Sequence, residues 1–569
     1  MSSSTINPLL QQAVELHRAG RVDEAVRAYK KVLRKDARAI GVLNLLGLAE
    51  FQLGHLAEAA DALTRAARLN PDLPNIDYNL GRVLQAQERF EDALVHYQKA
   101  VAKAPQDAEA LSNLGTVLAA LKRSDEAIAY YQRAVSLDPR HGDAWFNLGN
   151  ALKAAERYDE AFTAYSQVLA LRPEYTAAVG SLVYVLCRLD RHREAIEYAR
   201  RIIAVEPSDA GHHMNLANAL AVVGRDEEAL IAYDTALALD PVWSDILWNK
   251  GLFFLSRGRF AEGWPLYEER WRVSDAKLKQ RAYSATRWTG ERVSGPLLVW
   301  AEQGLGDQVL YSSMISDLRA FADAIVLEVD PRLVALLSRS FPDVTVIPQG
   351  HELFSGKVAA QAALGDIGRY LRPDGPSFRS SAGGYLKVDH ARAAALRARL
   401  RKGRQHVIGL SWGSSNREFG RFKSAQLSEL AAVLQIPNCQ FVDLQYGETG
   451  ADRAAAEAAT GIRIERVSEI DNTNDIDGLA ALMAACDAVV SVSNTNAHLA
   501  AAQGKATFVI LSDAGALFCY WMKRGDTTPF YGSARLFRKQ NGQTWPDLVA
   551  ANVAPKLTEY LASLSDQAK

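Results

Sequence analysis

The chain has 569 residues, of which 48% are hydrophobic and 23% are charged, and its formal net charge is −1. This composition is ordinary for a soluble globular protein, and the length corresponds to three or four domains. The near-neutral charge excludes a global electrostatic attraction to nucleic acid or to an anionic membrane. No apolar run approaches the ~20 residues of a transmembrane helix, so we expect no membrane span.

Neither the N-terminus nor the cysteines suggest export. The opening "MSSSTINPLL" has no basic region and no long apolar core, so we do not expect a signal peptide. The four cysteines are scattered without a CxxC pair, which favours buried thiols in a reducing compartment. We therefore expect a cytoplasmic protein. The cysteines are Cys187, Cys439, Cys486 and Cys519.

A period of 34 residues runs through the first half of the chain. Proline, alanine and leucine each recur six times with this step and without an insertion, and a Gly follows the first Leu residues. The recurring residues are Pro71, Pro105, Pro139, Pro173, Pro207 and Pro241; Ala59, Ala93, Ala127, Ala161, Ala195 and Ala229; and Leu46, Leu80, Leu114, Leu148, Leu182 and Leu216.

This pattern resembles the tetratricopeptide repeat over about residues 6–271. The resemblance implies two amphipathic helices per unit, with small residues where the helices cross and a proline after the second helix. A weak first unit and the atypical "GRFAEGWPLYEERW" are typical of the capping units at the ends of such an array. We therefore predict an α superhelix over residues 1–271.

An asparagine recurs at the sixth position of most units. This half resembles the O-GlcNAc transferases, in which an asparagine ladder holds the backbone of the acceptor peptide. An amide suits this task because it can both donate to and accept from a peptide group. The alternative is that "NLG" is simply common in such repeats. The predicted acceptor-binding residues are Asn79, Asn113, Asn147, Asn215 and Asn249, with Leu45 and Ser181 breaking the series.

The pattern changes after residue 271. Residues 272–295 are polar and aperiodic and are predicted to be a linker. From residue 296, apolar strands alternate with helices, as in an α/β fold with parallel strands. The strands "PLLVW", "AIVLEV" and "VTVIP" belong to a first half, residues 296–385, and "HVIGLSW", "CQFVDLQ", "IRIERV", "AVVSVS" and "ATFVIL" to a second, residues 386–569. We predict two Rossmann-like halves.

Two stretches in these halves resemble GT-B glycosyltransferases. "EQGLGDQVLYSSMISDLRA" is similar to the first strand-to-helix turn of heptosyltransferase-like enzymes, and "CDAVVSVSNTNAHLAAAQGKATFVIL" to their C-terminal motif. Asn494 stands where the motif usually has Asp, and Ala506 replaces a Pro. With the repeats, the chain resembles bacterial tetratricopeptide glycosyltransferases, among which are flagellin glycosyltransferases that use nonulosonic acids such as pseudaminic acid.

Two polar loops could bind the nucleotide sugar. "WGSSNREFGRFKS" follows a buried strand and offers hydroxyl, amide and cationic groups for phosphate, although it could be an ordinary solvated loop. "SNTNAH" opens a helix, whose first turn is suited to an anion, although His498 could instead be a capping or packing residue. The predicted donor-binding residues are Gly304, Gly306, Ser414, Ser415, Asn416, Arg417, Lys423, Gln445, Asn494, Thr495, Asn496 and His498.

Asp307 in "GLGD" is the predicted catalytic base. It follows the first strand of the first half, where α/β folds place ligands, and the resemblance implies a base there. The alternative is a residue that caps the following helix. Tyr446 is a further candidate for the nucleotide base, and Trp521 and Arg524 are candidates for closing over the donor.

These features predict a metal-independent protein O-glycosyltransferase, since no DxD motif follows a strand and no Walker or HExxH motif is present. The resemblance implies a CMP-linked nonulosonic acid as the donor, or alternatively UDP-GlcNAc, and flagellin as the acceptor. The nucleotide sugar is a substrate, so no cofactor is expected. The competing hypotheses are a non-catalytic adaptor with a degenerate α/β module, and an enzyme that glycosylates a lipid or saccharide.

Overall fold

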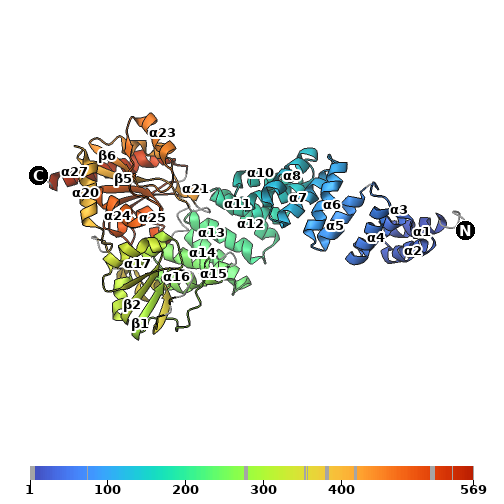
Figure 1. The fold of residues 1–569 in the computed structure, drawn as a ribbon, viewed down its shortest axis with the longest axis horizontal. Helices are drawn as coiled ribbons and strands as arrows, with labels where there is room; N and C mark the ends of the chain where they lie inside the picture. Colours follow the sequence, from blue (N-terminus) through green and yellow to red (C-terminus); the bar gives the residue numbers. More distant parts are fainter. Residues whose placement is uncertain are drawn as a thin grey trace. The chain divides into compact units, whose positions relative to one another are not determined.

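The computed structural model describes residues 7–73, 75–273, 278, 280–350, 354, 356–378, 384–415, 420–512, 519–540 and 542–567. The chain forms two compact units, residues 1–205 and residues 206–569. The first unit is helical, and the second combines helices with two parallel sheets (Figure 1). None of the described helices is long and apolar enough to cross a membrane.

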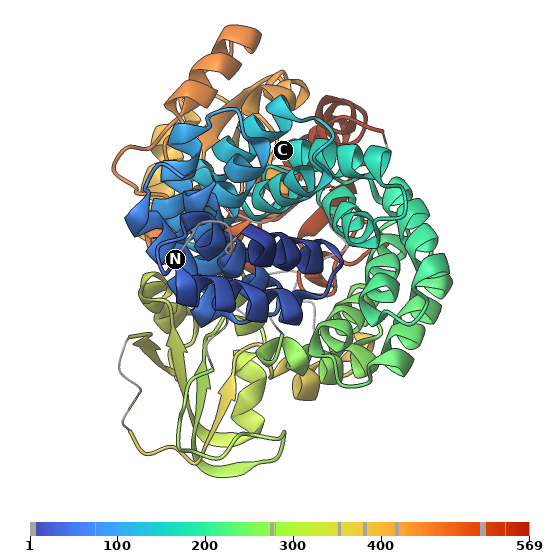
Figure 2. The same cartoon turned by 90° about the vertical axis from the view of Figure 1, so that its right-hand side faces the viewer.

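Helix pairs of the predicted repeats make up the first unit, which runs from dark blue to teal in Figure 2. Its helices are α1 (Asn7–Arg18), α2 (Val22–Lys35), α3 (Ile40–Gln52), α4 (Leu56–Leu69), α5 (Ile76–Ala86), α6 (Phe90–Lys103), α7 (Ala108–Ala120), α8 (Ser124–Leu137), α9 (Gly142–Ala154), α10 (Tyr158–Leu171), α11 (Thr176–Arg188) and α12 (His192–Val205). The second unit begins with two more such pairs, α13 (Ala210–Val222), α14 (Asp226–Leu239), α15 (Ser244–Ser256) and α16 (Phe260–Tyr267).

A glycine–tyrosine contact explains why the repeat keeps both residues. A Cβ atom added at Gly149 would lie 2.7 Å from the ring of Tyr165, and one at Gly81 would lie 2.9 Å from Tyr97. The tyrosine of the second helix therefore packs directly on the backbone of the first helix. Its buried hydroxyl still has a partner, since that of Tyr165 donates to Asn150 over 2.7 Å.

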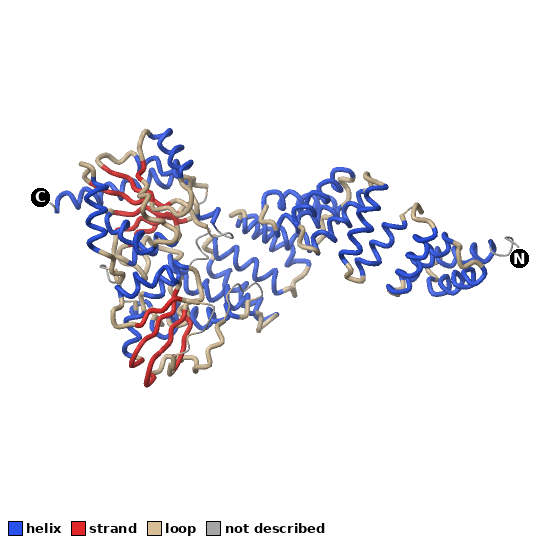
Figure 3. The backbone as a smooth tube through the Cα atoms, in the orientation of Figure 1, coloured by secondary structure: helices blue, strands red, loops and turns tan. Residues whose placement is uncertain are grey.

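Two separate parallel sheets follow in the second unit, as Figure 3 shows in red. The first has the order β3-β2-β1-β4, and the second has the order β10-β9-β8-β5-β6-β7. The strands are β1 (Val293–Trp300), β2 (Ala322–Val329), β3 (Thr345–Pro348), β4 (Ala360–Ala363), β5 (His406–Ser411), β6 (Cys439–Asp443), β7 (Ile464–Glu465), β8 (Ala488–Val492), β9 (Ala506–Leu511) and β10 (Ala534–Arg538). The predicted arrangement of repeats followed by two Rossmann-like halves is confirmed.

Helices connect most of the successive strands, as parallel pairing favours, and others precede or follow the sheets. They are α17 (Leu305–Ser312), α18 (Val334–Ser340) and α19 (Gly368–Leu371) in the first half, then α20 (His390–Arg401), α21 (Gly420–Lys423), α22 (Ala431–Leu434), α23 (Gly450–Thr460), α24 (Ile476–Ala485), α25 (Thr495–Ala502), α26 (Trp545–Leu548) and α27 (Ala554–Gln567). The basic helix α20 buries Ala393, Leu396 and Leu400 and pairs its arginines with acidic residues.

The last helix pair is part of the core of the α/β region. Phe260, Trp264 and Tyr267 of α16 belong to the same buried cluster as the strand residues Leu297 and Val299. The indole of Trp264 donates to the carbonyl of Arg372 over 2.8 Å. Trp288, within the segment predicted to be a linker, is only 2% exposed and belongs to this cluster as well. The aperiodic polar sequence of that segment does not reveal this buried tryptophan.

A buried ion cluster also connects the end of the last helix pair to the first sheet. Arg270, in the 3₁₀ turn Glu268–Trp271, lies 2.9 Å from Glu302 and 2.7 Å from Asp366, and all three side chains are at most 6% exposed. Glu302 follows β1 and Asp366 follows β4, which are neighbouring strands. Removing the arginine would leave the buried Glu302 without its cation, whereas Asp366 would keep Arg287 at 3.0 Å, and an uncompensated buried charge is strongly destabilising.

We predict that a fragment of residues 206–569 folds, whereas one of residues 272–569 does not. The shorter fragment loses α16 from the core and Arg270 from the ion cluster. Thermal unfolding followed by circular dichroism should give a cooperative transition for 206–569 and a broad one, or aggregation, for 272–569. Equal unfolding midpoints for the two fragments would show that the last repeats are not needed for the fold of the α/β region.

Candidate functional site at the junction of the two halves

The polar loops predicted from the sequence follow strands at the centre of the second sheet. If β5 is counted as the first strand, this parallel sheet has the order 3-2-1-4-5-6. The strand order therefore reverses between the neighbouring strands β5 and β8. Ligands of such sheets bind outside the carboxyl ends of the strands at this reversal. β5 ends at Ser411 and β8 at Val492, so the loops at residues 412–415 and 493–494 lie at that point.

Side-chain amides hold these loops together. The Gln445 Oε1 atom accepts from the Ser411 hydroxyl over 3.0 Å and from the backbone N–H groups of Trp412 and Gly413 over 3.0 and 2.8 Å. Asn496 donates to Ser411 over 3.0 Å and to the carbonyl of Leu444 over 2.7 Å. Gln445 and Asn496 are 5% and 1% exposed. These amides position the loops from inside.

Asn494 also makes internal contacts. It is the N-cap of α25, where its Oδ1 accepts from the backbone N–H groups of Asn496 and Ala497 over 3.0 and 3.2 Å. Its Nδ2 donates to Ser411 and to the carbonyl of Gly413, both over 2.8 Å. An aspartate would lack these two donors, so the asparagine in the motif matches the oxygen acceptors around it. Asn494 therefore already occupies the backbone N–H groups of Asn496 and Ala497 in the first turn of α25.

A buried aspartate, Asp443, holds the backbone of Gln445 in this network, and it was not predicted from the sequence. Asp443, at the end of β6, is fully buried and accepts from the backbone N–H of Gln445 over 2.8 Å. Burial raises the pKa of Asp443, against the hydrogen bond from Thr449 and the charges of Arg466 and Arg453. Arg466 also donates to the carbonyl of Gln445. Asp443 ends the apolar run "CQFV" and has no side-chain partner next to it in the sequence, because its side-chain partners are Thr449, Arg453 and Arg466. The sequence alone therefore gives no signal for it.

Asp307 belongs to the first turn of α17 in the first half. Gly304 is the N-cap and has no side chain, and the Asp307 carboxylate lies back over it. Burial raises the pKa of Asp307 to about 6, and the ammonium of Lys423 and the backbone N–H of Gly304 oppose the rise. The residue keeps partial access to solvent. The N-cap of α17 is Gly304, so Asp307 lies inside the first turn and is not the capping residue predicted as the alternative. Its raised pKa is suited to a general base.

Lys423 comes from α21 in the second half and is 8% exposed. Burial lowers the pKa of Lys423 to about 8, and the carboxylate of Asp307 opposes this change. Lys423 and Asp307 are thus close enough to influence each other, although one belongs to each half.

The helices α17 and α25 also belong to different halves, and we call their contact the junction. A Cβ atom at Gly306 would lie 3.1 Å from the imidazole of His498 and 3.5 Å from Thr495. The absence of a side chain at Gly306 therefore lets the two helix starts approach each other. Both Gly306 and Thr495 were predicted from the sequence, and the structure brings them together.

His498 is enclosed by aromatic rings and is 2% exposed. It stacks on Trp521 at 4.8 Å, meets Tyr520 edge-on at 4.8 Å, and its Nδ1 lies 3.0 Å from the hydroxyl of Tyr531. Burial, and then the charge of Lys423, lowers the pKa of His498 to about 3, so the imidazole is neutral. This arrangement favours the packing alternative for His498. Trp521 is fully buried behind it, and its indole donates to Ser493 over 2.8 Å.

Tyr520 is a neighbour of Asp307 that sequence reasoning missed. Burial, followed by the charge of Asp307, raises the pKa of Tyr520 far above its usual value, so the phenol keeps its proton. Cys519 is next to it, and burial raises the pKa of its thiol to about 12, which makes the thiol inert. The sequence places both residues about 210 positions from Asp307, with no motif that links them.

The remaining predicted donor residues lie in the loop after β5. The backbone N–H of Ser414 donates to Ser424 over 2.9 Å, and that of Ser415 donates to the hydroxyl of Tyr446. Asn416 and Arg417 lie outside the described residues. Within the described part of the chain, no group of three or more His, Cys, Asp or Glu residues is arranged to hold a metal ion.

The asparagine ladder lies on the first helices of successive repeats. Asn79 donates to Asn44 over 3.2 Å, Asn113 donates to the hydroxyl of Tyr78 over 3.1 Å, and Asn249 donates to the carbonyl of Asp245 over 2.8 Å. Asn79 is buried, whereas Asn113, Asn147, Asn215 and Asn249 are half-buried. Ladder amides thus contact the preceding repeat or their own helix while most of them keep access to solvent.

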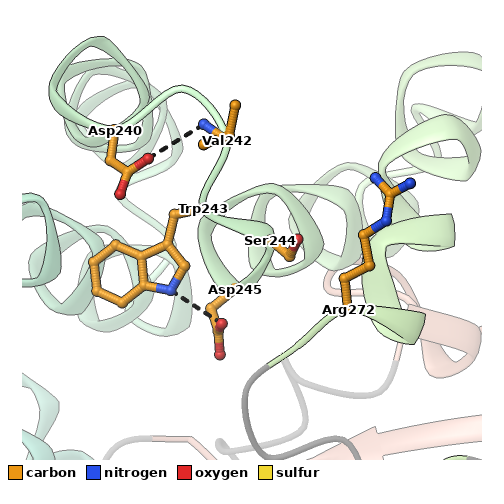
Figure 4. A pocket seen from close by; sticks show the side chains of 6 residues that line it. All are labelled: Asp240, Val242, Trp243, Ser244, Asp245 and Arg272. Atoms are coloured by element: carbon orange, nitrogen blue, oxygen red, sulfur yellow. Dashed lines mark hydrogen bonds between the residues drawn. The ribbon is translucent and has the colours of Figure 1, made fainter.

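A hollow on the last repeats is separate from these residues (Figure 4). The Asp240 carboxylate accepts from the backbone N–H of Val242 over 3.3 Å, and the Trp243 indole donates to Asp245 over 3.0 Å. Ser244 and Arg272 complete the lining. None of these residues was predicted from the sequence, and none reaches the junction.

The raised pKa of Asp307 gives a pH-dependent stability. The unfolded chain ionises this group near pH 3.8, whereas the folded chain ionises it near pH 6. The free energy of unfolding therefore falls as pH rises from about 3.8 to 6 and stays lower above pH 6. We expect Asp307→Asn to raise the unfolding midpoint, and more at about pH 7.5 than at about pH 5. Asp389→Asn is the control with the opposite sign, since a backbone N–H of Arg392 lowers the pKa of Asp389. A pH-independent difference for Asp307→Asn would contradict the raised pKa.

Comparisons with known proteins identify the repeats. The tetratricopeptide repeat model matches residues 10–74, 78–141, 125–176 and 182–242. Protein FlbA of Caulobacter vibrioides is 32% identical over 336 residues, which are 55% of this chain and 55% of FlbA. The chain thus spans about half the length of this relative.

Among solved structures, MamA from Desulfovibrio magneticus RS-1 is 25% identical, with a TM-score of 0.29 over 30% of this chain and 96% of MamA. YrrB, described as a TPR protein with an unusual peptide-binding site, is 27% identical, with a TM-score of 0.28 over 30% of this chain and 88% of YrrB. With the period of 34 and the helix pairs described above, the family-model match confirms tetratricopeptide repeats as the N-terminal part of the chain.

Proposed function

We propose that the protein is a metal-independent glycosyltransferase that moves a sugar from a nucleotide sugar to a Ser or Thr hydroxyl of an acceptor protein held by the repeats. The observation that supports this most directly is the electrostatic interaction between Asp307 and Lys423, which belong to different halves. One is a carboxylate whose pKa is raised to about 6, and the other is an ammonium whose pKa is lowered to about 8. Perturbed pairs of this kind are typical of acid–base sites.

The two groups suit the two needs of the reaction. Asp307 would take the proton of the acceptor hydroxyl as its oxygen bonds to the anomeric carbon. The bond between that carbon and the phosphate oxygen breaks, and the nucleotide leaves with the electron pair. Lys423 would neutralise the phosphate, because a charge-assisted contact in a desolvated site is strong. The donor we favour is a CMP-linked nonulosonic acid, with UDP-GlcNAc as the alternative, and the acceptor we favour is flagellin.

A non-catalytic adaptor is the second candidate. The observation that favours it is the internal use of Gln445, Asn494 and Asn496, together with the enclosure of His498. Incubating the purified chain with each nucleotide sugar and with flagellin, followed by intact-mass measurement of the flagellin, separates the two candidates. A mass increase of one sugar residue supports the enzyme. Unmodified flagellin with both donors, despite binding to the repeats, supports the adaptor.

We expect Asp307→Asn to lower the rate of transfer by about 10²–10⁴-fold without weakening nucleotide binding, which is the usual effect of losing a positioned general base. Asparagine keeps the size of the side chain and an oxygen that can accept from Gly304. Lys423→Ala should instead weaken nucleotide binding, by about 1.5–3 kcal/mol for a charged hydrogen bond. Single-turnover transfer and calorimetry with free CMP or UDP separate these effects. Near wild-type transfer by Asp307→Asn would remove this residue from the mechanism.

The ladder gives an independent prediction. Replacing Asn113, Asn147 and Asn215 with Ala should weaken acceptor binding by ~1 kcal/mol for each lost amide contact. Replacing Asn79 alone is the control, because Asn79 is buried whereas the three replaced residues are half-buried and can reach the acceptor. Affinity is measured by calorimetry and folding by circular dichroism. Unchanged affinity in a folded triple variant would assign the ladder to packing within the repeats.

A further inference from the structure

A short segment of the second half, residues 519–524, reaches from the junction to the last two repeats. We call it the strap. Its first part, the 3₁₀ turn Cys519–Trp521, lies beside Asp307 and under His498. Its last part, Lys523 and Arg524, contacts helix ends of the repeats.

Helix ends leave backbone groups without partners inside the helix, and the strap supplies some of those partners. The ammonium of Lys523 donates to the carbonyl of Val222, the last residue of α13, over 2.5 Å. The backbone N–H of Lys523 donates to the carbonyl of Ser256, the last residue of α15, over 2.7 Å. A cation at the end of a helix is also favoured by the helix dipole.

The third contact is with the start of a helix. Arg524 lies 2.9 Å from Asp226, the first residue of α14. Asp226 also pairs with Arg257 over 2.8 Å, and Arg257 donates to the carbonyl of Ala221 over 2.6 Å. The two arginines therefore share one carboxylate. Through these contacts the strap joins the ends of three different helices.

Side chains on the two sides of Met522 contact different parts of the protein. Met522 has a φ of 55°, a left-handed conformation that is uncommon for a residue with a side chain. On one side of it Trp521 is fully buried, and on the other Lys523 and Arg524 point to the repeats. Arg538, at the end of β10, donates to the carbonyl of Met522 over 2.6 Å and also to that of Trp521. Such a conformation persists where surrounding contacts over-determine it.

We propose that Lys523 and Arg524 are positioning residues, through which the last two repeats hold the Cys519–Trp521 wall of the junction in place. Tyr520 of that wall meets the ring of His498 edge-on at 4.8 Å, and Trp521 stacks on the same ring. The charge of Asp307 also raises the pKa of Tyr520, after burial. The repeats thus take part in shaping the site as well as in binding the acceptor. The effect on transfer rests on the proposed function, whereas the mechanical link does not.

The test uses the full chain with Lys523→Met and Arg524→Ala together. We expect amide exchange in the peptide containing Met522 and Lys523 to become about tenfold faster, because local opening loses two of its restraints. The single variant Arg524→Lys keeps a cation beside Asp226, so amide exchange in the same peptide should stay close to that of the wild type. Arg225→Ala is the matched control, since it breaks an exposed pair with Glu228 at the start of the same helix without touching the strap.

Transfer kinetics give the second measurement. We expect the double variant to lower kcat by about tenfold while the Kd for free CMP or UDP stays unchanged, since wall placement affects reaction geometry. Unchanged exchange in the folded double variant would overturn the mechanical link. Faster exchange with an unchanged kcat would overturn the positioning role. If the wild-type chain transfers no sugar, the proposed function is wrong. The exchange measurement then still decides whether Lys523 and Arg524 restrain residues 519–524.

Discussion

The close approach of Gly306 to His498 is the tightest constraint we find on the contact between α17 and α25. A Cβ atom at Gly306 would lie 3.1 Å from the imidazole, so the ring or one of the two helices would have to shift by a few tenths of an ångström. Asp307 is the next residue along α17, and Lys423 lies close enough to change its pKa. The position of the carboxylate relative to the ammonium therefore depends on one residue that has no side chain. The rest of the proposed chemistry depends on that position.

The loops of the second half are preorganised by their own amides. Gln445, Asn494 and Asn496 converge on Ser411 and on the backbone of residues 412 and 413, with Asp443 behind them. A buried network of this kind specifies one loop conformation when its members are satisfied. In the glycosyltransferase we propose, these residues would shape the donor site without touching the donor. Lys423, Thr495 and the backbone of the loop after β5 would then make the direct contacts.

Much of the fold could be predicted because its signals are periodic or local. The step of 34 residues predicts the helix pairs, and the glycine and tyrosine of three units are explained by their contact, as for Gly149 and Tyr165. The apolar runs that end in "GLGD" and "SNTNAH" correctly placed two loops at strand ends. What could not be predicted depends on residues far apart in the sequence. The aromatic enclosure of His498 needs residues 520–531, and the buried anchor Trp288 lies in an aperiodic segment.

The central claim is that a nucleotide binds at the junction, with its phosphate beside Lys423 and its reacting end towards Asp307. The most direct measurement is a crystal structure of the full chain soaked with CMP or UDP, supported by calorimetry under the same conditions. We predict a phosphate oxygen within hydrogen-bonding distance, about 2.7–2.9 Å, of the Lys423 ammonium. A nucleotide bound away from both α17 and α25, or no binding of either nucleotide at millimolar concentration, would contradict the account.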